Sequence, residues 1–320
     1  MIILLVMPIV RGMAQDFHFS QFMQTMAYVN PAYVALPTMG EVGLAYRNQW
    51  PGIPATFVTY GATVVIPVET LSSGVGVSFL NDMQGSGVIN RTSASLLYGY
   101  LLKINRTWQV GAGINASYIF KRFNADQLVF RSDILNDLGY SYAPVTFTNY
   151  SKGYPDFSLG FIARNDKHLS FGVSANHVTR PNDSFSELEN SRLPVKYAAF
   201  VSGRIMVTKH LTGNSLVLEP AAFFSQQKQN QELVWGTQFL LGDNFQIGGW
   251  FRQNLSFQYE SFIISAGISW EHYNISYSYD VNLKKIQPLS TKMAAHEVTF
   301  LYRFKYNDKK NKKIECPAYL

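Results

Sequence analysis

The property that most constrains this chain is an alternation of apolar and polar side chains, repeated in segment after segment with a period of two residues. It runs almost unbroken from Tyr259 to Trp270. One face of that segment carries Phe262, Ile264, Ala266, Ile268 and Trp270. The other face carries Ser261, Ile263, Ser265, Gly267 and Ser269. Successive side chains of a β-strand point to opposite faces, so the pattern predicts a strand with one apolar face and one mainly small, polar face.

Two kinds of β-sheet protein contain such strands. A soluble one hides the apolar face in a core, whereas a transmembrane barrel turns that face towards lipid and keeps polar side chains in the lumen. The composition favours the barrel. Of 320 residues, 47% are hydrophobic and 15% aromatic, and 15% are charged, against roughly 25% in ordinary soluble proteins. The mean hydropathy is −0.03, and no apolar run approaches the ~18 residues of a membrane-spanning helix.

About fourteen segments show the strand pattern. They are residues 40–48, 55–66, 74–82, 91–103, 107–121, 155–164, 168–178, 195–208, 215–226, 232–241, 245–252, 259–270, 273–282 and 295–305. Most have about nine to thirteen residues, which suits a tilted strand that crosses the hydrocarbon layer. Because an even number of strands returns the chain to the side where it started, we expect both termini on the periplasmic side.

The connections between these segments alternate in length. Short ones lie at 104–106, 165–167, 242–244 and 271–272, and longer ones at 122–154, 179–194 and 283–294. Short periplasmic turns that alternate with longer outer loops are typical of outer-membrane barrels. Lipid offers no hydrogen-bond partner to a free sheet edge, so the sheet is expected to close. The prediction is an all-β fold, with one closed antiparallel transmembrane barrel over residues 40–305.

The two ends of the chain lie outside this pattern. Residues 1–14 are predicted to be a signal peptide, with an apolar stretch and then a small-residue cleavage site before Gln15. The alternative is a buried first strand. Residues 15–39 show little strand pattern, and we expect them to form a periplasmic segment or a plug. Residues 306–320 form a basic tail, expected in the periplasm.

The charge is concentrated in that tail. The formal net charge is +6, and Lys309, Lys310, Lys312 and Lys313 lie close together. The basic character therefore belongs to the tail, and no nucleic-acid partner is expected. The lysines either bind periplasmic partners or are simply solvated. Cys316 is the only cysteine, which excludes an intramolecular disulfide and a CxxC metal site.

Charged side chains on the lumen-facing parity of the strands have mixed signs. They are Arg47, Lys196, Arg204, Glu219, Asp280, Glu297 and Arg303. An ion-selective pore tends to be lined by one sign. Unpaired charges at low dielectric are costly, so we expect ion pairs across the lumen, a plug, or both. Asp280 is expected to pair with Arg303 on the adjoining strand. The alternative is that several of these charges lie near strand ends and are hydrated.

No motif indicates catalysis. The chain has no HExxH, no G-x-S-x-G and no glycine-rich phosphate loop, so we expect no enzyme activity, catalytic residue, cofactor or metal. Some outer-membrane lipases use a His and a Ser on the barrel face. His177 lies on the lipid-facing parity near a strand end, but no Ser is clearly paired with it. We therefore expect His177 to be a structural residue at the membrane interface.

Short local sequences resemble those of the PorP/SprF family. They are Gln15–Met23, Tyr28–Tyr33, Tyr46–Gly52, Tyr154–Gly160, Leu193–Tyr197, Tyr277–Asp280, Ala295–Glu297 and Cys316–Pro317. They follow the family's order over nearly the whole mature chain. His18, the segment Met23–Val29 and the final residues Ala318–Leu320 depart from the family pattern. The family consists of outer-membrane proteins of the type IX secretion and gliding system of Bacteroidetes.

The resemblance implies a component that helps to export or retain large surface adhesins. Its implied partners are outer-membrane lipids, a secreted adhesin-type client, and the type IX translocon with its periplasmic ring components. Trp50, Pro51 and Gly52 form a rigid turn, and the amphipathic Trp50 side chain suits a partner pocket; the alternative is a plain hairpin turn. The alternative function is an outer-membrane transporter for hydrophobic or other small substrates, like the fatty-acid channels.

Overall fold

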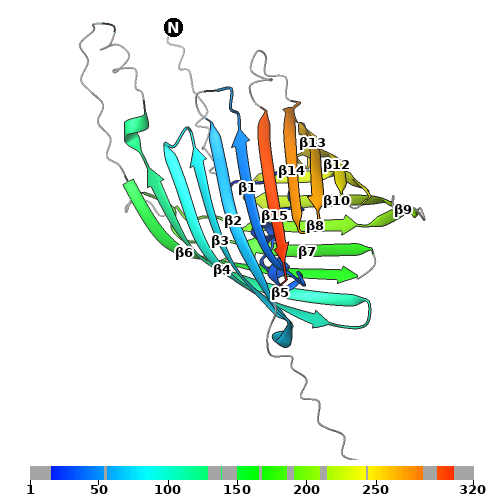
Figure 1. Ribbon diagram of the computed structural model, residues 1–320. Helices are drawn as coiled ribbons and strands as arrows, with labels where there is room; N and C mark the ends of the chain where they lie inside the picture. Colours follow the sequence, from blue (N-terminus) through cyan, green and yellow to red (C-terminus); the bar gives the residue numbers. More distant parts are fainter. Residues whose placement is uncertain are drawn as a thin grey trace, which may run out of the picture.

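The computed structural model describes residues 16–53, 56–128, 138, 150–165, 168–185, 191–209, 215–242, 244–283 and 294–305. Over this part of the chain the protein is a closed antiparallel β-barrel (Figure 1). The predicted fold, a single barrel of about fourteen strands, is confirmed. Within the described residues, no helix has the length and apolar character needed to cross a membrane.

The barrel wall consists of consecutive strands. They are β1 (Gly40–Gln49), β2 (Phe57–Val68), β3 (Ser73–Gln84), β4 (Ile89–Lys103), β5 (Trp108–Phe123), β6 (Tyr150–Asn165), β7 (Leu169–Asn176), β8 (Lys196–Gly203), β9 (Ile205–Lys209), β10 (Ser215–Gln227), β11 (Asn230–Leu241), β12 (Phe245–Gln253), β13 (Tyr259–Trp270), β14 (Tyr273–Asn282) and β15 (Ala295–Phe304). In the part of the chain that the structure describes, four short helices accompany them, namely α1 (Met26–Val29), η1 (Pro31–Ala35), η2 (Glu69–Leu71) and η3 (Ala125–Gln127).

The sheet closes where the first strand meets the last. β1 pairs with β15 over its whole length, from Gly40 opposite Phe304 to Gln49 opposite Ala295. β8 and β9 are the two halves of the expected strand 195–208. They are separated at Arg204, and both pair with β10. Counted in this way, the barrel has the expected number of strands, and every strand has a neighbour on both sides, as lipid requires.

The two faces of the wall differ as the alternation predicts. Side chains that point outwards are mostly large and apolar, and they are exposed on the outer surface of the wall. Examples are Leu96, Ile114, Phe161, Ile247 and Ile268. On the inner face, small and polar side chains are buried. Examples are Thr63, Ser158, Ser265, Ser276 and Ser278. This is the arrangement of a transmembrane barrel, in which lipid solvates the outside.

The two ends of the barrel have different connections. One end, here called the short-loop end, has tight links such as residues 271–272 between β13 and β14. The other, the long-loop end, has long links such as residues 124–149 between β5 and β6. β5 and β6 each contain 16 residues, so the expected strands 107–121 and 155–164 were too short.

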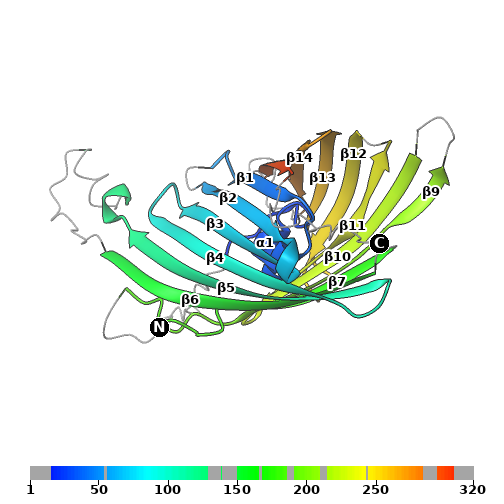
Figure 2. The ribbon, with the colours of Figure 1, turned by 60° about the horizontal axis from the view of Figure 1, so that its bottom comes forward.

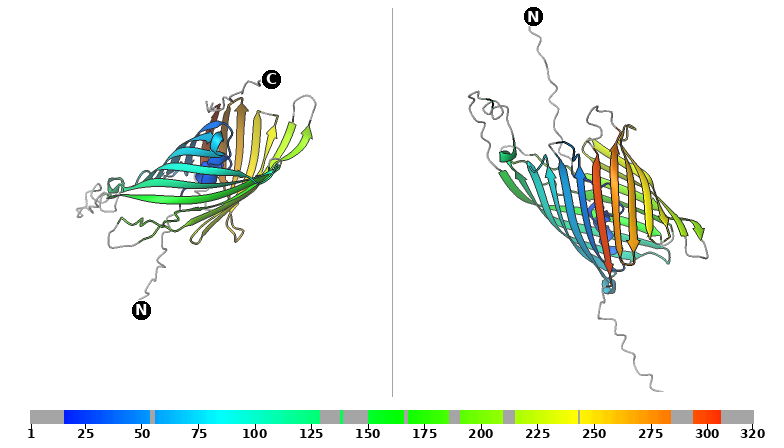
Figure 3. Two further views of the ribbon diagram at one scale, coloured as in Figure 1. Left: turned by 90° about the horizontal axis from the view of Figure 1, so that it is seen from below. Right: turned by 45° about the horizontal axis from the view of Figure 1, so that its top comes forward.

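Residues 16–39, here called the luminal segment, lie inside the barrel (Figures 2 and 3). The segment starts at the long-loop end, where Asp16 contacts Arg91 and His177. It passes through α1 and η1 and enters β1 at the short-loop end. The described part of this region therefore runs along the inner face of the wall from the long-loop end to the short-loop end. Asp16 and Lys305 are therefore at opposite ends of the barrel.

Candidate functional site

The candidate site is the lumen, where the luminal segment meets the barrel wall. Near the long-loop ends of β1, β12, β14 and β15, four charged side chains form a cluster, here called the central cluster. Arg47 contacts Asp280 at 2.9 Å and Glu297 at 3.1 Å, and Arg252 contacts Asp280 at 2.7 Å. None of the four side chains is more than 6% exposed. Two cations and two anions thus face one another in a nearly water-free interior, where each needs its partners.

The luminal segment completes this charge cluster. The backbone N–H groups of Ser20 and Gln21 donate to the Glu297 carboxylate at 2.6 and 2.9 Å. The Ser20 hydroxyl donates to Asp280 at 2.7 Å and accepts from the guanidinium groups of Arg252 and Arg47. Bonds between charged groups and such donors are stronger than neutral ones. The barrel therefore presents a charged surface on which the segment fits with most hydrogen bonds satisfied.

A second cluster holds the start of the luminal segment at the long-loop end. Asp16 pairs with Arg91, contacts His177 Nε2 at 2.7 Å, and accepts from Gln227 Nε2 at 2.9 Å. The other ring nitrogen of His177 lies 2.7 Å from Asp156. Burial by itself would raise the pKa of Asp16, but His177 and Arg91 hold it well below its ordinary value. Asp16 is therefore a buried carboxylate that is charged at neutral pH.

His177 occupies a different place from the one its parity predicts. It follows β7, and its φ of 58° turns its side chain into the lumen, where it is 7% exposed. The expectation of a lipid-facing His177 was wrong, because a left-handed residue breaks the alternation of an extended chain. Burial would lower its pKa, but Asp16 and Asp156 raise it to about 9. Both ring nitrogens are engaged by carboxylates, which leaves neither to activate a serine.

A row of glycines receives the middle of the luminal segment. Gly74, Gly99, Gly113 and Gly160 lie directly opposite one another on β3, β4, β5 and β6. A Cβ atom at Gly74 would overlap the carbonyl of Val34, and one at Gly113 would overlap the backbone of Pro31 and Ala32. At Gly99 a Cβ would meet Val34 and Ala35 in very tight contact. The row is thus a shallow channel in the wall, shaped for residues 30–35.

Apolar side chains fill the lumen beside this channel. Phe22 stacks on Phe223 with ring centroids 5.3 Å apart and meets Trp250 edge-on at 5.6 Å. Ile263, the exception in the alternation of its strand, is fully buried in this cluster. The same cluster includes Met26 of α1. An apolar residue on the lumen face is therefore explained by the apolar side chains of the luminal segment that cover it.

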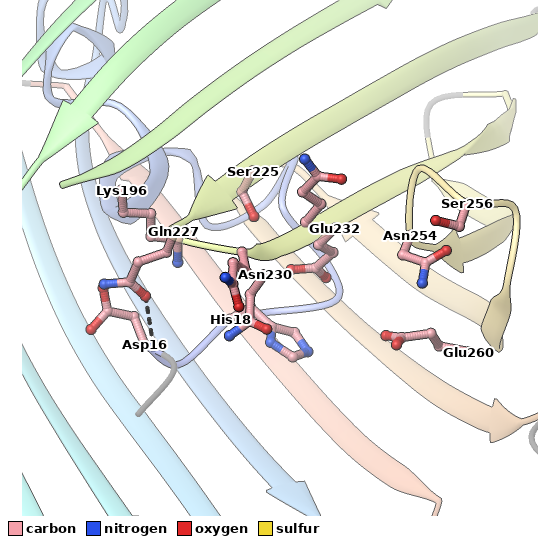
Figure 4. Close-up of a pocket in the computed structure, with 12 residues that line it drawn as sticks. Asp16, His18, Lys196, Ser225, Gln227, Asn230, Glu232, Asn254, Ser256 and Glu260 are labelled. Atoms are coloured by element: carbon pink, nitrogen blue, oxygen red, sulfur yellow. Dashed lines mark hydrogen bonds between the residues drawn. The ribbon is translucent and has the colours of Figure 1, made fainter. Parts of the chain in front are cut away.

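A polar cavity of about 250 Å³ remains at the long-loop end (Figure 4). Asp16 and His18 of the luminal segment form part of its wall, and strands and connections from β8 to β13 form the rest. Its lining includes Lys196, Gln231, Glu232, Asn254, Ser256 and Glu260. Burial lowers the pKa of His18 to about 3, so this imidazole is neutral. Smaller cavities among the described residues have volumes of about 90 Å³ and about 20 Å³.

The structure separates the predicted lumen charges into several groups. It brings Arg47, Asp280 and Glu297 together in the central cluster. Arg204 pairs instead with Glu219 at 3.5 Å and is 62% exposed, so it is not a buried lumen charge. Its position in the break between β8 and β9 explains this exposure.

Arg303 also lies apart from the central cluster. It contacts Glu41 at 3.1 Å near the short-loop end. The expected pair between Asp280 and Arg303 was therefore wrong, because the register of β14 and β15 places the two residues at different heights. Lys196 donates to the carbonyl oxygen of Phe17 at 3.3 Å and lines the polar cavity.

Trp50, Pro51 and Gly52 lie in the β1–β2 connection at the long-loop end. The backbone N–H of Trp50 donates to the carbonyl of Ala294 at 2.8 Å. Its indole ring packs edge-on against Phe57, with centroids 5.2 Å apart. Trp50 is partly exposed, and its φ is 61°. The predicted signal peptide (residues 1–14) and the predicted tail, with Lys309, Lys310, Lys312, Lys313 and Cys316, fall outside the described residues.

Sequence reasoning missed several residues that hold the luminal segment. They are Asp16, Arg91, Asp156, Glu232 and Arg252. Strand parity would have found Arg91, Asp156 and Arg252, since each shares the inward face of its strand with buried small or polar residues. Asp16 had no such signal, because it precedes the first strand. Among the described residues, no group of His, Cys, Asp and Glu side chains is arranged to hold a metal ion.

Comparisons with known proteins place this geometry in context. The sequence matches the family described as "Type IX secretion system membrane protein PorP/SprF" over residues 12–302. The fold is similar to the toluene transporter TbuX of Ralstonia pickettii, with a TM-score of 0.50, 10% identity, and coverage of 87% of this chain and 92% of that chain. For the toluene transporter TodX of P. putida, the TM-score is 0.50 and the identity is 10%, with coverage of 88% of this chain and 94% of that chain. At this identity the likenesses show the fold alone. No curated protein matches the chain.

Proposed function

Because the chain belongs to the PorP/SprF family of type IX secretion system membrane proteins, we propose that it is a docking barrel, which retains a secreted adhesin-type client at the cell surface. The family match confirms the resemblance seen in the sequence and supports an outer-membrane component of this secretion machinery. The identity of the client and the docking role are our proposal. The observation that carries it is the lumen, which is filled by the chain's own residues 16–39.

The filled lumen supports docking over conduction. The central charge cluster, the glycine row and the apolar cluster hold the luminal segment at successive levels of the barrel. A folded or extended client cannot pass through a lumen occupied in this way. The surface available to a client is then the long-loop end, while the outer wall faces lipid. Under this proposal, the barrel acts by binding partner proteins at its long-loop and short-loop ends.

We place the long-loop end outside the cell and the short-loop end in the periplasm, as in other outer-membrane barrels. Trp50, Pro51 and Gly52 then lie on the outer surface, where an indole that is half apolar and half polar suits a protein contact. β15 ends on the periplasmic side, and we propose that the lysines of residues 306–320 bind translocon or ring components there. Residues 36–39 of the luminal segment also reach this side.

Surface retention tests the docking role. Trp50→Ala should lower the amount of adhesin held on intact cells, measured by antibody binding and protease shaving, without lowering barrel levels in the outer membrane. Trp270→Ala is the matched control, because Trp270 is an exposed tryptophan in the last position of β13 at the opposite end. Equal retention in the wild type and in cells lacking the barrel would remove the docking proposal.

Co-purification tests the periplasmic contacts. Deletion of residues 306–320 should reduce recovery of periplasmic ring components with the barrel. The barrel itself should keep its heat-modifiable migration, because the deleted residues follow β15. Replacing Lys309, Lys310, Lys312 and Lys313 with glutamines tests whether the charge is what matters. Undiminished recovery would remove the tail from the proposal.

The transporter alternative is weaker. The fold is shared with proteins named as toluene transporters, but a hydrocarbon route needs a continuous apolar passage. The lumen cavity of about 250 Å³ at the long-loop end is lined by polar side chains. Planar-bilayer conductance separates the two functions. The docking barrel should conduct little until residues 16–39 are deleted, whereas a transporter should show uptake of a hydrophobic solute with the segment in place.

A further inference from the structure

We propose that the free edge of β6 at the long-loop end is a docking site for an extended segment of the secreted client, which joins the barrel wall as an added antiparallel strand. The inference rests on the proposed docking function and gives the client a backbone conformation and a site. With the long-loop end outside the cell, a secreted polypeptide reaches this edge without entering the membrane.

β6 reaches further towards the long-loop end than β7, the next strand of the wall (Figure 2). β5 accompanies β6 over its whole length. β7 pairs with it only over residues 159–165, and one further bond joins the N–H of Val178 to the carbonyl of Phe157 at 3.0 Å. Residues 150–156, here called the β6 edge, therefore lie beyond the last backbone bond on the side of β7.

Five backbone groups of the β6 edge have no hydrogen-bond partner in the part of the chain that the structure describes. The Phe157 carbonyl points towards β7, and the backbone groups of every second residue in a strand point to the same side. These groups are the N–H and C=O of Ser151 and Gly153, and the C=O of Pro155. All three residues are exposed. Lipid cannot bond to such groups, so they lie in water unless another strand pairs with them.

The connection that follows β7 turns away from the β6 edge and covers its inner face. His177 and Arg180 have φ angles of 58° and 48°, a left-handed conformation that ends an extended strand. Asp183 then accepts from the hydroxyl of Tyr154 at 2.8 Å and pairs with Lys121 at 2.7 Å. Tyr154 and Lys121 point into the barrel. In the described part of the chain, the place beside the β6 edge where β7 would have continued is therefore left open.

The β6 edge is held in place although one side of it is unpaired. On the inner face, Lys152 donates to the carbonyl oxygen of Ser184 at 2.7 Å. On the outer face, the Tyr118 side chain occupies the space beside Gly153, where a Cβ atom would overlap its hydroxyl group. An incoming strand therefore meets a preorganised edge, which lowers the entropy cost of pairing.

These surroundings specify the strand that fits. An extended polypeptide presents N–H and C=O groups at the spacing of the β6 edge. The inward side chains of an added strand meet the connection around Asp183, so they must be small. The outward ones stand beside Ser151 and Gly153, which leave room for β-branched side chains. The expected client segment alternates small and β-branched residues.

A second copy of the barrel fits this requirement poorly. If two β6 edges paired antiparallel in one continuous sheet, each would place its own inward side chains against the other's covered inner face. In β6 these side chains include Lys152 and Tyr154, which are large and already bonded to the connection after β7. The geometry therefore favours a client segment over a dimer.

Backbone N-methylation tests strand addition on the unaltered barrel. The purified barrel in detergent is titrated with a fluorescent peptide of about eight residues that alternates Thr and Ser, and binding is followed by fluorescence polarisation. Outward residues of an antiparallel strand on this side turn their N–H groups towards β6. N-methylation of the Thr residues should therefore weaken binding by at least about tenfold, and N-methylation of the Ser residues by less than about twofold. Equal binding of the two methylated peptides would overturn the proposal.

Variants of Ser151 locate the binding. Ser151→Pro removes an N–H that points away from β5, so the β5 ladder stays complete and the barrel should keep its heat-modifiable migration. Binding of the unmethylated peptide should fall by about tenfold. Ser151→Ala, which keeps the N–H, should bind as the wild type does. Unchanged binding in Ser151→Pro would rule the β6 edge out. A barrel that is dimeric in detergent and becomes monomeric in Ser151→Pro would make a second copy the occupant and overturn the client segment.

Cell-surface retention keeps this inference distinct from the proposed function. If adhesin retention requires the barrel but is unchanged in Ser151→Pro, the docking function stands and the β6 edge is not its site. If retention does not require the barrel, the docking function fails whatever the peptides do in solution. Loss of peptide binding together with loss of retention in Ser151→Pro, at normal barrel levels, supports both.

Discussion

The side chain of Asn30 occupies the space that Gly160 leaves by lacking a Cβ atom. Its Nδ2 donates to the carbonyl oxygens of Phe161 and Val173 at 3.1 and 3.0 Å, and its Oδ1 accepts from the backbone N–H of Ala32 at 3.0 Å. A buried amide with both its donor and acceptor sides engaged fixes the chain around it. The luminal segment is therefore an integral part of the barrel at this level.

Gly113→Ala should displace the luminal segment. The added Cβ would overlap the backbone of Pro31 and Ala32, which cannot rotate away as a flexible side chain can. Overpacking of this kind typically costs about 1–3 kcal/mol. We expect faster proteolysis within residues 16–39 of the purified barrel and a lower temperature for loss of the folded band in gels.

Gly111→Ala is the control for that experiment. Gly111 lies on the same face of β5, but its nearest neighbour, the carbonyl oxygen of Ala32, would be 3.5 Å from the new Cβ, an ordinary contact. This variant should resemble the wild type. If both variants resist protease equally, the fit of the segment into the glycine row does not hold it in place.

Arg47→Met should strongly destabilise the barrel. It leaves Glu297 and Asp280 short of a cation in a site that excludes water, and removing one partner of a buried pair costs about 3–5 kcal/mol. The double variant Arg47→Met with Glu297→Gln should recover part of the loss, because it also removes a carboxylate. Arg204→Met, at an exposed ion pair, should change stability by less than about 1 kcal/mol. Thermal unfolding in detergent measures the stability of all three variants. If the loss of stability in the double variant equalled the sum of the losses from its two substitutions made singly, Arg47 and Glu297 would not be energetically coupled.

Strand parity was sufficient to place much of this cluster on the lumen face. It put Arg47, Asp280 and Glu297 there, and it marked Ile263 as the exception in its strand. It could not show which charges meet, since that depends on the register of strands far apart in sequence. Asp280 pairs with Arg47, which is 233 residues away in the sequence. The pair expected between Asp280 and Arg303 of the adjoining strand does not form, because Arg303 contacts Glu41.

Local backbone conformation explains the residues that parity misplaced or missed. His177 turns inwards because of one left-handed residue, which an alternation pattern cannot register. The glycine row has a sequence signal only as scattered glycines. The role of these glycines follows only from the strand register, which places Gly74, Gly99 and Gly113 directly opposite one another. Residues 16–39 lack periodicity because their contacts change from charged to apolar to backbone groups along their length.

Raising the pH should release the start of the luminal segment. The pKa of His177 is about 9 in the folded protein, above its ordinary value of 6.5. Its charge therefore stabilises the contact with Asp16 fully below about pH 6.5, and this contribution is lost as the pH rises through about 9. Hydrogen exchange of residues 16–21 should accelerate between about pH 7 and pH 10, after correction for the intrinsic pH dependence.

His177→Gln is the control for this pH dependence. The amide keeps the size and hydrogen-bonding capacity of the side chain but does not titrate in this range. The corrected exchange of residues 16–21 should then be faster than in the wild type near neutral pH and nearly independent of pH. A pH response of unchanged size in His177→Gln would assign it to another group.

Neighbouring residues of β13 test which side of the wall faces lipid. Ile263 is fully buried against the apolar cluster of the luminal segment, whereas Ile264 points outwards and is 48% exposed. Ile263→Ala should cost about 2–4 kcal/mol, because it leaves a cavity beside Phe22 and Trp250. Ile264→Ala should cost less than about 1 kcal/mol, because mobile acyl or detergent chains fill the lost volume. Thermal unfolding in detergent compares them. Equal losses at the two positions would mean that both faces pack against protein, which a barrel solvated by lipid does not allow.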